Sequence, residues 1–173
     1  MIILVLGGTR SGKSGVAESI AQSLGLAVTY VATAAVDEKD SDHAARVAAH
    51  QARRPKHWST VECEEPEDLP RHLDEIDGVV LVDSLGTWVA HHSGLTVEAD
   101  GLLDALARRT DPAVIVSEEV GLSVHAPTEL GRRFADELGM LNQKMAAVAD
   151  RVLLVVAGRA LELPGSDEAV LRP

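Results

Sequence analysis

Gly7-Gly-Thr-Arg-Ser-Gly-Lys-Ser14 is the stretch that decides the fold of this 173-residue chain. It matches the phosphate-loop pattern G-x-x-x-x-G-K-[ST] without a mismatch. An apolar run at 2–6 precedes it and a helical segment at 13–24 follows it, as the mechanism of such a loop requires. A chance match is expected in about one chain per hundred of this length. The sequence therefore predicts a nucleotide-binding loop between a buried strand and a helix.

The residue types in this loop suit the binding of phosphate. Gly7 and Gly12 are expected to adopt backbone angles closed to other residues, so that loop amides turn toward phosphate oxygens. The helix that begins near Lys13 directs the positive end of its dipole to the same place. Lys13 is expected to reach the β- and γ-phosphates, and the Ser14 hydroxyl to ligate Mg²⁺. The expected phosphate-loop contacts are Gly7, Gly8, Thr9, Arg10, Ser11, Gly12, Lys13 and Ser14.

A carboxylate at the end of a neighbouring strand is expected to complete the magnesium site. The apolar run 79–82 is followed directly by Asp83. We predict that this strand lies beside the loop strand, that Ser14 ligates the metal ion, and that Asp83 holds the same ion through water. The alternative is an Asp that only caps the next helix.

A second acidic candidate is the pair Glu118-Glu119, which follows the strand-like run 113–117. Carboxylates at the carboxyl end of a strand face the ligand crevice of an α/β sheet and can act as a base or metal ligand. They can equally cap a turn. The sequence leaves both interpretations open.

Strand-like and helical segments alternate along the chain. Continuous apolar runs bounded by turn residues lie at 2–6, 28–32, 79–82, 113–116 and 152–156. Helices are expected at 13–24, 40–53 and 128–149. This alternation predicts an α/β fold: one P-loop NTPase-type domain over residues 1–173, with a mostly parallel sheet and helices on both faces. The apolar stripe of the last helix is interpreted as core packing: Leu130, Phe134, Leu138, Leu141, Met145 and Val148.

Composition excludes several classes of protein. The net charge of −11 argues against broad nucleic-acid binding, which needs a basic surface. The one cysteine, Cys63, allows no intrachain disulfide, which agrees with a reducing, cytoplasmic compartment. The apolar run at 1–6 is too short to span a bilayer, so we expect a buried strand there and no membrane span.

His50 lies one turn after Arg46 and just before Arg53 and Arg54, in AARVAAHQARRPKHW at 44–58. A neutral imidazole is a competent nucleophile toward phosphorus, and nearby arginines would hold the attacked phosphates. The same pattern also describes an exposed helix of mixed charge. Spacing alone favours the exposed helix. None of the seven histidines forms a tight pattern of zinc ligands.

The whole chain resembles the bifunctional adenosylcobinamide kinase / adenosylcobinamide-phosphate guanylyltransferase family of cobalamin biosynthesis. The most specific elements are H-x-x-R-R-P-x-x-W at 50–58 and F-x-D-x-x-G-x-x-N-Q at 134–143. The matching pieces occur in the family's order: 7–14, 30–34, 45–58, 80–89, 116–121 and 127–158. Two departures are Ser84, where a Cys is common, and His91 or His92, where an Asn is usual.

The resemblance implies two reactions. Such enzymes phosphorylate the aminopropanol hydroxyl of adenosylcobinamide with GTP or ATP, and then transfer GMP from GTP to that phosphate. The GMP passes through a phosphoramidate on a histidine, which by motif position is His50. Arg53, Arg54 and Glu62 are implied nucleotide contacts, and Asp83 the metal-side carboxylate. Members that resemble this chain assemble as a homotrimer.

Two other functions compete with this one. A single-function P-loop kinase for another small metabolite would need Lys13, Ser14 and Asp83 but would give His50 no chemical role. A non-catalytic nucleotide-binding module would need only the loop. The arginine-rich segment around His50 argues against such a module, because simple nucleotide binding does not require it.

Overall fold

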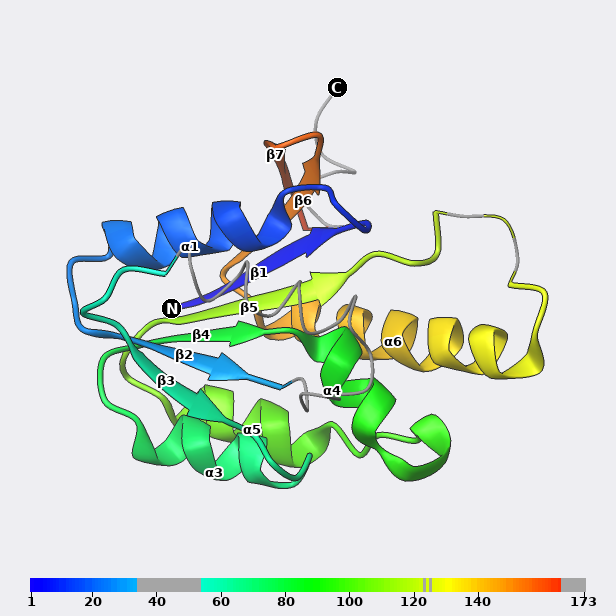
Figure 1. Ribbon diagram of the computed structural model, residues 1–173, viewed down its shortest axis with the longest axis horizontal. Coiled ribbons are helices and arrows are strands. Elements are labelled where there is room, and N and C mark those ends of the chain that lie inside the picture. Colours follow the sequence, from blue (N-terminus) through cyan, green and yellow to red (C-terminus); the bar gives the residue numbers. More distant parts are fainter. Residues whose placement is uncertain (34–53, 123, 125, 166–173) are drawn as a thin grey trace.

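The computed structural model describes residues 1–33, 54–122, 124 and 126–165, which form a layered α/β structure (Figure 1). The strands are β1 (Ile2–Gly7), β2 (Val28–Ala32), β3 (Ser59–Glu62), β4 (Val79–Asp83), β5 (Ala113–Glu118), β6 (Arg151–Val156) and β7 (Arg159–Leu163). The helices are α1 (Lys13–Ser23), α3 (Asp68–Glu75), α4 (Leu85–His91), α5 (Asp100–Arg108) and α6 (Glu129–Val148), with a 3₁₀ turn η1 (Ser93–Leu95).

One seven-stranded sheet has the order β3-β2-β4-β5-β1-β6-β7. All neighbouring strands are parallel except β6 and β7, which are antiparallel. The predicted mostly parallel sheet is therefore confirmed. All the described elements belong to or cover this one sheet, and a single domain over residues 1–173 stays a prediction.

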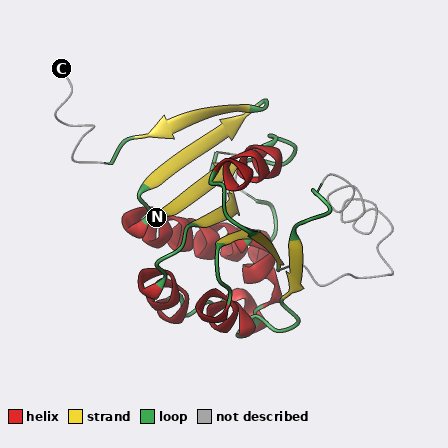
Figure 2. Ribbon diagram, turned by 90° about the vertical axis from the view of Figure 1, so that its left-hand side faces the viewer, coloured by secondary structure: helices red, strands yellow, loops and turns green. Residues whose placement is uncertain are grey.

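The sheet separates two hydrophobic cores. Helix α1 packs on one face against the strand side chains that include Val5, Leu81 and Val116. Helices α3, α4, α5 and α6 cover the opposite face, where Leu69, Trp88 and other apolar side chains are buried. Figures 1 and 2 show these two layers from perpendicular directions. The prediction of helices on both faces is confirmed.

The central strands are buried on both faces, which explains their uninterrupted apolar sequences. The burial of β1, β4 and β5 is nearly complete along their length. The expected runs at 2–6, 28–32, 79–82, 113–116 and 152–156 all coincide with observed strands.

The last apolar run found in the sequence, 152–156, is not the last strand of the structure. Ala157 and Gly158 both have positive φ, 51° and 75°, which is the backbone of a two-residue hairpin turn. The chain therefore returns as β7, antiparallel to β6. Strand β7 is largely exposed, so it lacks the apolar run by which buried strands are recognised.

The placement predicted for the strand ending in Asp83 was wrong. Strand β4 does not lie beside the loop strand β1, because β5 is inserted between them. Strands lie about 4.8 Å apart in a sheet, so Asp83 stands about 10 Å from the loop strand. Of the two strands directly beside β1, β5 ends at Glu118 and β6 ends at Val156.

The apolar stripe of α6 is only partly core. Leu138, Leu141 and Met145 are buried against the sheet, as expected. Leu130, in the first turn of the helix, is 67% exposed, and Val148, in the last turn, is 42% exposed. The interpretation as core packing therefore holds for the middle of the stripe but not for its two end residues.

Cys63 follows β3 and is buried, and its amide donates to the carbonyl of Ala32 at 2.8 Å. Burial, followed by the nearby Asp68 carboxylate, raises the pKa of the Cys63 thiol to about 11. We expect iodoacetamide to label the native protein at pH 8 about 100-fold more slowly than the urea-unfolded chain. Mass spectrometry over time measures both rates.

The same shift sets the sign of a pH effect on stability. The unfolded chain ionises this thiol near pH 8.5, whereas the folded chain keeps the proton until about pH 11. The Cys63 contribution to the free energy of unfolding therefore falls as pH rises through this window. Equal labelling rates for the native and unfolded chains at pH 8 would contradict the burial of Cys63.

Candidate functional site

The candidate site lies where the parallel strands end at one edge of the sheet. Strand register brings Gly7 of β1 level with Glu118 of β5, and Ala32 of β2 level with both Asp83 of β4 and Glu62 of β3. Ligands of open α/β sheets bind outside this carboxyl edge. Side chains alternate between faces along a strand, so Asp83 and Glu118 share the face on which Tyr30 and α1 pack.

The loop between β1 and α1 has the backbone that the sequence predicts at Gly12. This residue precedes the first helical residue, Lys13, with φ at 93°, and no side chain caps the helix at residue 12. Arg10 also takes positive φ, 57°, which costs a non-glycine residue about 1 kcal/mol. The Ser11 amide closes the turn by donating to the Gly8 carbonyl at 3.2 Å. The loop is thus shaped to present the N-terminus of α1.

Gly7 is needed for a different reason from the one predicted. Its φ is not in the left-handed region. A side chain at this position would meet the Val155 carbonyl oxygen of β6, 2.8 Å from an ideal Cβ. Close approach of two backbones therefore requires glycine here, whereas backbone angle requires it at Gly12.

The hairpin turn between β6 and β7 contacts and supports the phosphate loop. The Gly158 amide donates to the Ser11 carbonyl at 2.7 Å. A Cβ on Gly12 would stand 3.1 Å from the Gly158 Cα. Sequence reasoning missed this contact because it joins positions more than 140 residues apart.

Lys13 points toward the end of β5. Its Nζ lies 3.3 Å from Glu118 Oε1, and the two side chains are 12% and 25% exposed. The sequence left the roles of Glu118 and Glu119 open. Of these two residues, Glu118 is therefore the one that contacts the phosphate loop. Glu119 instead accepts from the amide of Gly121 at 2.7 Å, which is the turn-capping role.

The other oxygen of Glu118 is held by the start of α4. Oε2 accepts from the Ser84 hydroxyl and from the Gly86 amide, each at 3.0 Å. A Cβ on Gly86 would collide with this carboxylate oxygen. The glycine at 86 thus makes room for Glu118, and the two donors fix the carboxylate in place.

Asn142, within the F-x-D-x-x-G-x-x-N-Q segment, secures the backbone of β5. Its Nδ2 donates to the Glu118 carbonyl at 3.0 Å, and its Oδ1 accepts from the buried Ser117 hydroxyl at 2.6 Å. The Glu119 amide donates to the Gly7 carbonyl at 3.1 Å. The end of β5 is therefore tied to both α6 and the loop strand.

Asp83 lies in a polar cluster with Tyr30 and Arg54. Its Oδ2 accepts from the Tyr30 hydroxyl at 2.9 Å, and the Arg54 guanidinium stacks 3.3 Å from the centre of the Tyr30 ring. Burial and then the Asp83 carboxylate raise the pKa of Tyr30 far above its usual value, so the hydroxyl keeps its proton. The alternative role for Asp83 as a helix cap was wrong, because Ser84 caps α4.

Comparison with protein families gives a match over nearly the whole chain. Residues 3–163 match the family described as cobinamide kinase / cobinamide phosphate guanyltransferase. The chain belongs to this family. The resemblance seen in the sequence motifs is thereby confirmed.

Individual relatives agree with the membership of the cobinamide kinase / guanyltransferase family. The bifunctional adenosylcobalamin biosynthesis protein CobP of Pseudomonas aeruginosa is 41% identical, over 94% of this chain and 96% of its own length. The bifunctional adenosylcobalamin biosynthesis protein CobU of Escherichia coli is 33% identical, over 94% of this chain and 99% of its own length.

Solved structures share the fold at much lower identity. The flagellar accessory protein FlaH of Methanocaldococcus jannaschii has a TM-score of 0.53 and 14% identity, over 94% of this chain and 77% of its own. The RadB recombinase has a TM-score of 0.50 and 18% identity, over 88% and 73%. At these identities the likeness concerns the fold of this cobinamide kinase / guanyltransferase family member alone.

The remaining expected site residues of this family member lie in several places. Glu62 is exposed at the end of β3, and Thr9 and Arg10 are exposed in the loop. His50 and Arg53 lie outside the described residues. Within the described part of the chain, the structure therefore brings Lys13 to Glu118, and Arg54 and Asp83 to Tyr30.

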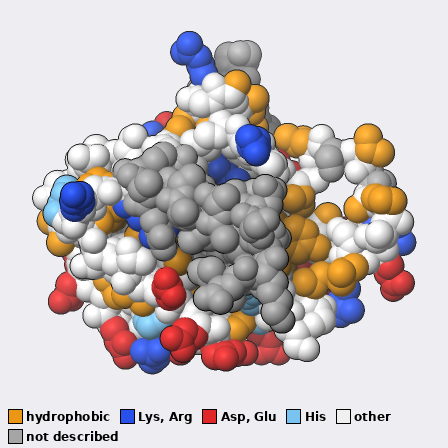
Figure 3. Space-filling view, viewed as in Figure 1, with side chains coloured by type: hydrophobic (Ala, Val, Ile, Leu, Met, Phe, Trp, Pro, Cys, Tyr) orange, Lys and Arg blue, Asp and Glu red, His pale blue; other side chains and the backbone are white. Residues whose placement is uncertain are grey.

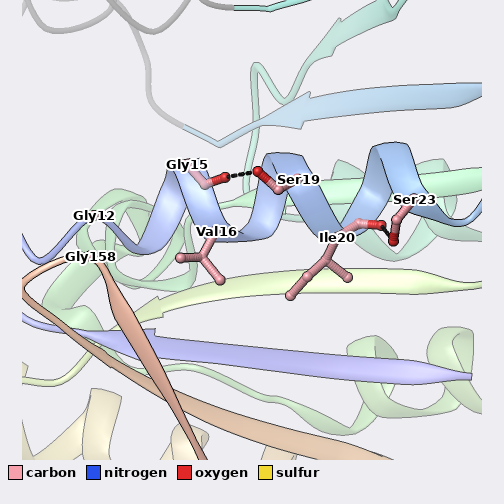
Figure 4. Close-up of a pocket in the computed structure, with 7 residues that line it drawn as sticks. All are labelled: Gly12, Gly15, Val16, Ser19, Ile20, Ser23 and Gly158. Carbon is pink, nitrogen blue, oxygen red and sulfur yellow. Dashed lines mark hydrogen bonds between the residues drawn. The ribbon is translucent and has the colours of Figure 1, made fainter.

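A shallow groove of about 460 Å³ runs along α1 on another side of the loop. It is lined by Gly12, Gly15, Val16, Ser19, Ile20, Ser23 and Gly158. Figure 4 shows Val16 and Ile20 directed to the same side of the helix. Among the residues that the structure describes, none that lines this groove is charged, so these residues supply no cation for a triphosphate.

Proposed function

We propose that this chain carries out both reactions of its family on one phosphate loop. It phosphorylates the aminopropanol hydroxyl of adenosylcobinamide with GTP or ATP, and then transfers GMP from GTP to the new phosphate. Membership of the family supports the pair of activities. The observation that carries the proposal here is Lys13, which stands at the start of α1 beside the carboxyl edge of the sheet.

In the first reaction the loop and Lys13 bind the triphosphate. Backbone amides at the start of α1 and the Lys13 ammonium hold the β- and γ-phosphates and stabilise the charge that builds on them. The substrate hydroxyl oxygen bonds to the γ-phosphorus and gives up its proton to solvent, the bond to the bridging oxygen breaks, and a nucleoside diphosphate leaves. Catalysis of this kind depends on positioning and charge.

Mg²⁺ suits the oxygen donors at this edge. Ser14 offers a hydroxyl and Asp83 a carboxylate, which are ligand types that this ion prefers. Asp83 ends β4, two strands from β1, and this separation agrees with a contact through water rather than a direct bond. Bound Mg²⁺ would neutralise charge on the phosphate oxygens.

In the second reaction His50 attacks the α-phosphorus of GTP. A nitrogen–phosphorus bond forms, the bond to the β-phosphate oxygen breaks, and pyrophosphate leaves. The phosphate on the corrinoid then attacks the same phosphorus, and the imidazole leaves. Arg54 supports this step, because its guanidinium is seated on Tyr30 at the same strand ends as Asp83 and arginine suits phosphate contacts. Arg53 and Glu62 are the other proposed nucleotide contacts.

A product analysis tests the proposal. The protein is incubated with adenosylcobinamide, Mg²⁺ and either ATP alone or GTP, and the corrinoids are identified by mass. ATP alone is expected to give the corrinoid phosphate, and GTP the GDP-linked corrinoid with pyrophosphate. Phosphate formation without the GDP-linked product would favour a single-function kinase. Nucleotide binding with neither product would favour a binding module.

We also propose that the protein works as a homotrimer in the cytoplasm. Exposed apolar side chains that support self-association lie on α6 and on the loop before it, at Leu122, Val124, Leu130 and Met140. Figure 3 shows hydrophobic side chains gathered on this part of the surface. Within the described residues, no helix is long and apolar enough to cross a membrane.

The oligomeric state is measured by light scattering during size-exclusion chromatography. We expect about three times the monomer mass of 18.3 kDa. Replacing Leu130 by Lys is expected to lower the mass toward that of the monomer, because a charge in an apolar contact is costly. A monomeric wild-type protein at micromolar concentration would reject the trimer.

A further inference from the structure

Glu118 places a negative charge beside the phosphate loop, which the established chemistry of phosphate binding does not require. Its carboxylate ends the strand that pairs with β1, and its Oε1 lies 3.3 Å from Lys13 Nζ. Lys13 is also the cation proposed to hold the β- and γ-phosphates. The carboxylate and the phosphates therefore compete for one ammonium group.

Glu118 is held by contacts that do not involve Lys13. Its Oε2 stays bound to the Ser84 hydroxyl and the Gly86 amide, each at 3.0 Å. Asn142 holds the backbone of the same residue from α6. A carboxylate fixed through one oxygen keeps its charge in place, whatever happens at the other oxygen.

We propose that Glu118 is an affinity-setting residue that competes with the nucleotide for Lys13 and thereby promotes product release. A triphosphate has enough negative charge to take Lys13 from the carboxylate. Pyrophosphate or a nucleoside diphosphate holds Lys13 less strongly, so Glu118 regains the ammonium group and repels the departing anion. The inference rests on the proposed function, and specifically on Lys13 as a phosphate ligand.

The competition between Glu118 and the phosphates for Lys13 is strong enough to change the rate of product release. The two side chains are only 12% and 25% exposed, so solvent screens them less than a surface pair. A charge-assisted contact of this kind changes binding about tenfold when it is removed. Loss of the competitor should therefore tighten product binding, whereas loss of a merely structural residue would weaken it.

The first variant is Glu118→Gln, which removes the charge and keeps an oxygen to accept from Ser84 and Gly86. Calorimetry with GDP and with pyrophosphate, in EDTA, measures binding without catalysis or metal. We expect both dissociation constants to fall about tenfold. The steady-state kcat should fall as well, because release becomes slower, while the single-turnover rate changes less.

Glu119→Gln is the matched control. It removes the same charge one residue later. The Glu119 carboxylate accepts a hydrogen bond from the Gly121 amide, within the same turn. Its dissociation constants for GDP and pyrophosphate are expected to stay within about twofold of the wild type.

A second variant moves the carboxylate without removing it. In Gly86→Ala the new Cβ would collide with Glu118 Oε2, so the side chain must shift from its place beside Lys13. We expect the dissociation constants for GDP and pyrophosphate to fall, as in Glu118→Gln, but by a smaller factor. Thermal unfolding monitored by circular dichroism checks that each variant is folded before binding is compared.

The outcomes separate this inference from the proposed function. Unchanged or weaker GDP and pyrophosphate binding in folded Glu118→Gln would overturn the competition and would mean that Glu118 merely orients Lys13. A wild-type protein that binds no nucleotide at all would reject the proposed function itself. Equal tightening in Glu119→Gln would also overturn the inference, because it would assign the effect to net charge.

Discussion

Replacing His50 by alanine is expected to abolish guanylyl transfer and to leave the phosphorylation of adenosylcobinamide within about threefold of the wild-type rate. The two reactions differ in the phosphorus that is attacked. The γ-phosphorus is attacked by the substrate hydroxyl, which needs the loop but no protein nucleophile. The α-phosphorus is attacked by the imidazole in our proposal, so this step cannot occur without it.

Intact mass after incubation with GTP and Mg²⁺ measures the intermediate directly. Wild-type protein is expected to gain the mass of one GMP residue, and His50→Ala to gain none. A phosphoramidate is lost in acid and kept in alkali, so brief treatment with each identifies the type of bond. Formation of the corrinoid phosphate from ATP, measured on the same preparations, reports the kinase step.

His57→Ala is the control for a nearby histidine. His57 is exposed and lies in the same H-x-x-R-R-P-x-x-W segment, so its loss changes local composition in a similar way. It is expected to retain the adduct. An adduct that persists in His50→Ala would assign the nucleophile to another residue. No adduct on wild-type protein that binds GTP would favour a simple kinase or a binding module.

Local pattern was sufficient to predict the central strands and the phosphate loop. A strand buried on both faces must be apolar throughout, and such runs can be found one segment at a time. The loop could be predicted because the required glycine and lysine lie within eight consecutive residues, 7–14. At Gly12 the predicted reason, a positive φ, is also the observed one.

Strand order could not be predicted in this way. The insertion of β5 between β1 and β4 depends on how helices pack on the sheet, and an apolar strand carries little information about its neighbours. Asp83 was therefore placed one strand too close to the loop. For the same reason the sequence left Glu118 and Glu119 equivalent, although only the first contacts Lys13.

Contacts between distant segments were missed because a local motif does not indicate which distant residue it contacts. Gly158 braces the loop through Ser11, and Asn142 holds the end of β5. Asn142 lies in the segment at 134–143 that carries the family resemblance. That segment marked the residue as typical of the family but did not indicate what it does. The structure gives that role as support for the strand that carries Glu118.

Replacing Lys13 by alanine is expected to abolish both reactions, lowering each rate by at least about 1,000-fold. In our proposal both steps use a triphosphate held by the same loop, and this ammonium is the cation on its β- and γ-phosphates. GTP binding should weaken about 100-fold, because the triphosphate loses that cation and still faces the fixed charge of Glu118. The fold should persist, since alanine is the best helix former at the first position of α1.

Three measurements on one preparation test this prediction: GTP affinity by calorimetry, corrinoid phosphate formation from ATP, and the GMP adduct from GTP. Lys56→Ala is the control, because Lys56 is an exposed lysine away from the loop sequence. Loss of only the adduct in Lys13→Ala would mean that the two reactions use different triphosphate sites. Combining Lys13→Ala with Glu118→Gln should recover part of the lost affinity, because the unpaired carboxylate no longer repels the phosphates. Affinity would instead fall further if Glu118 served the nucleotide directly, so the double variant decides which role this carboxylate has.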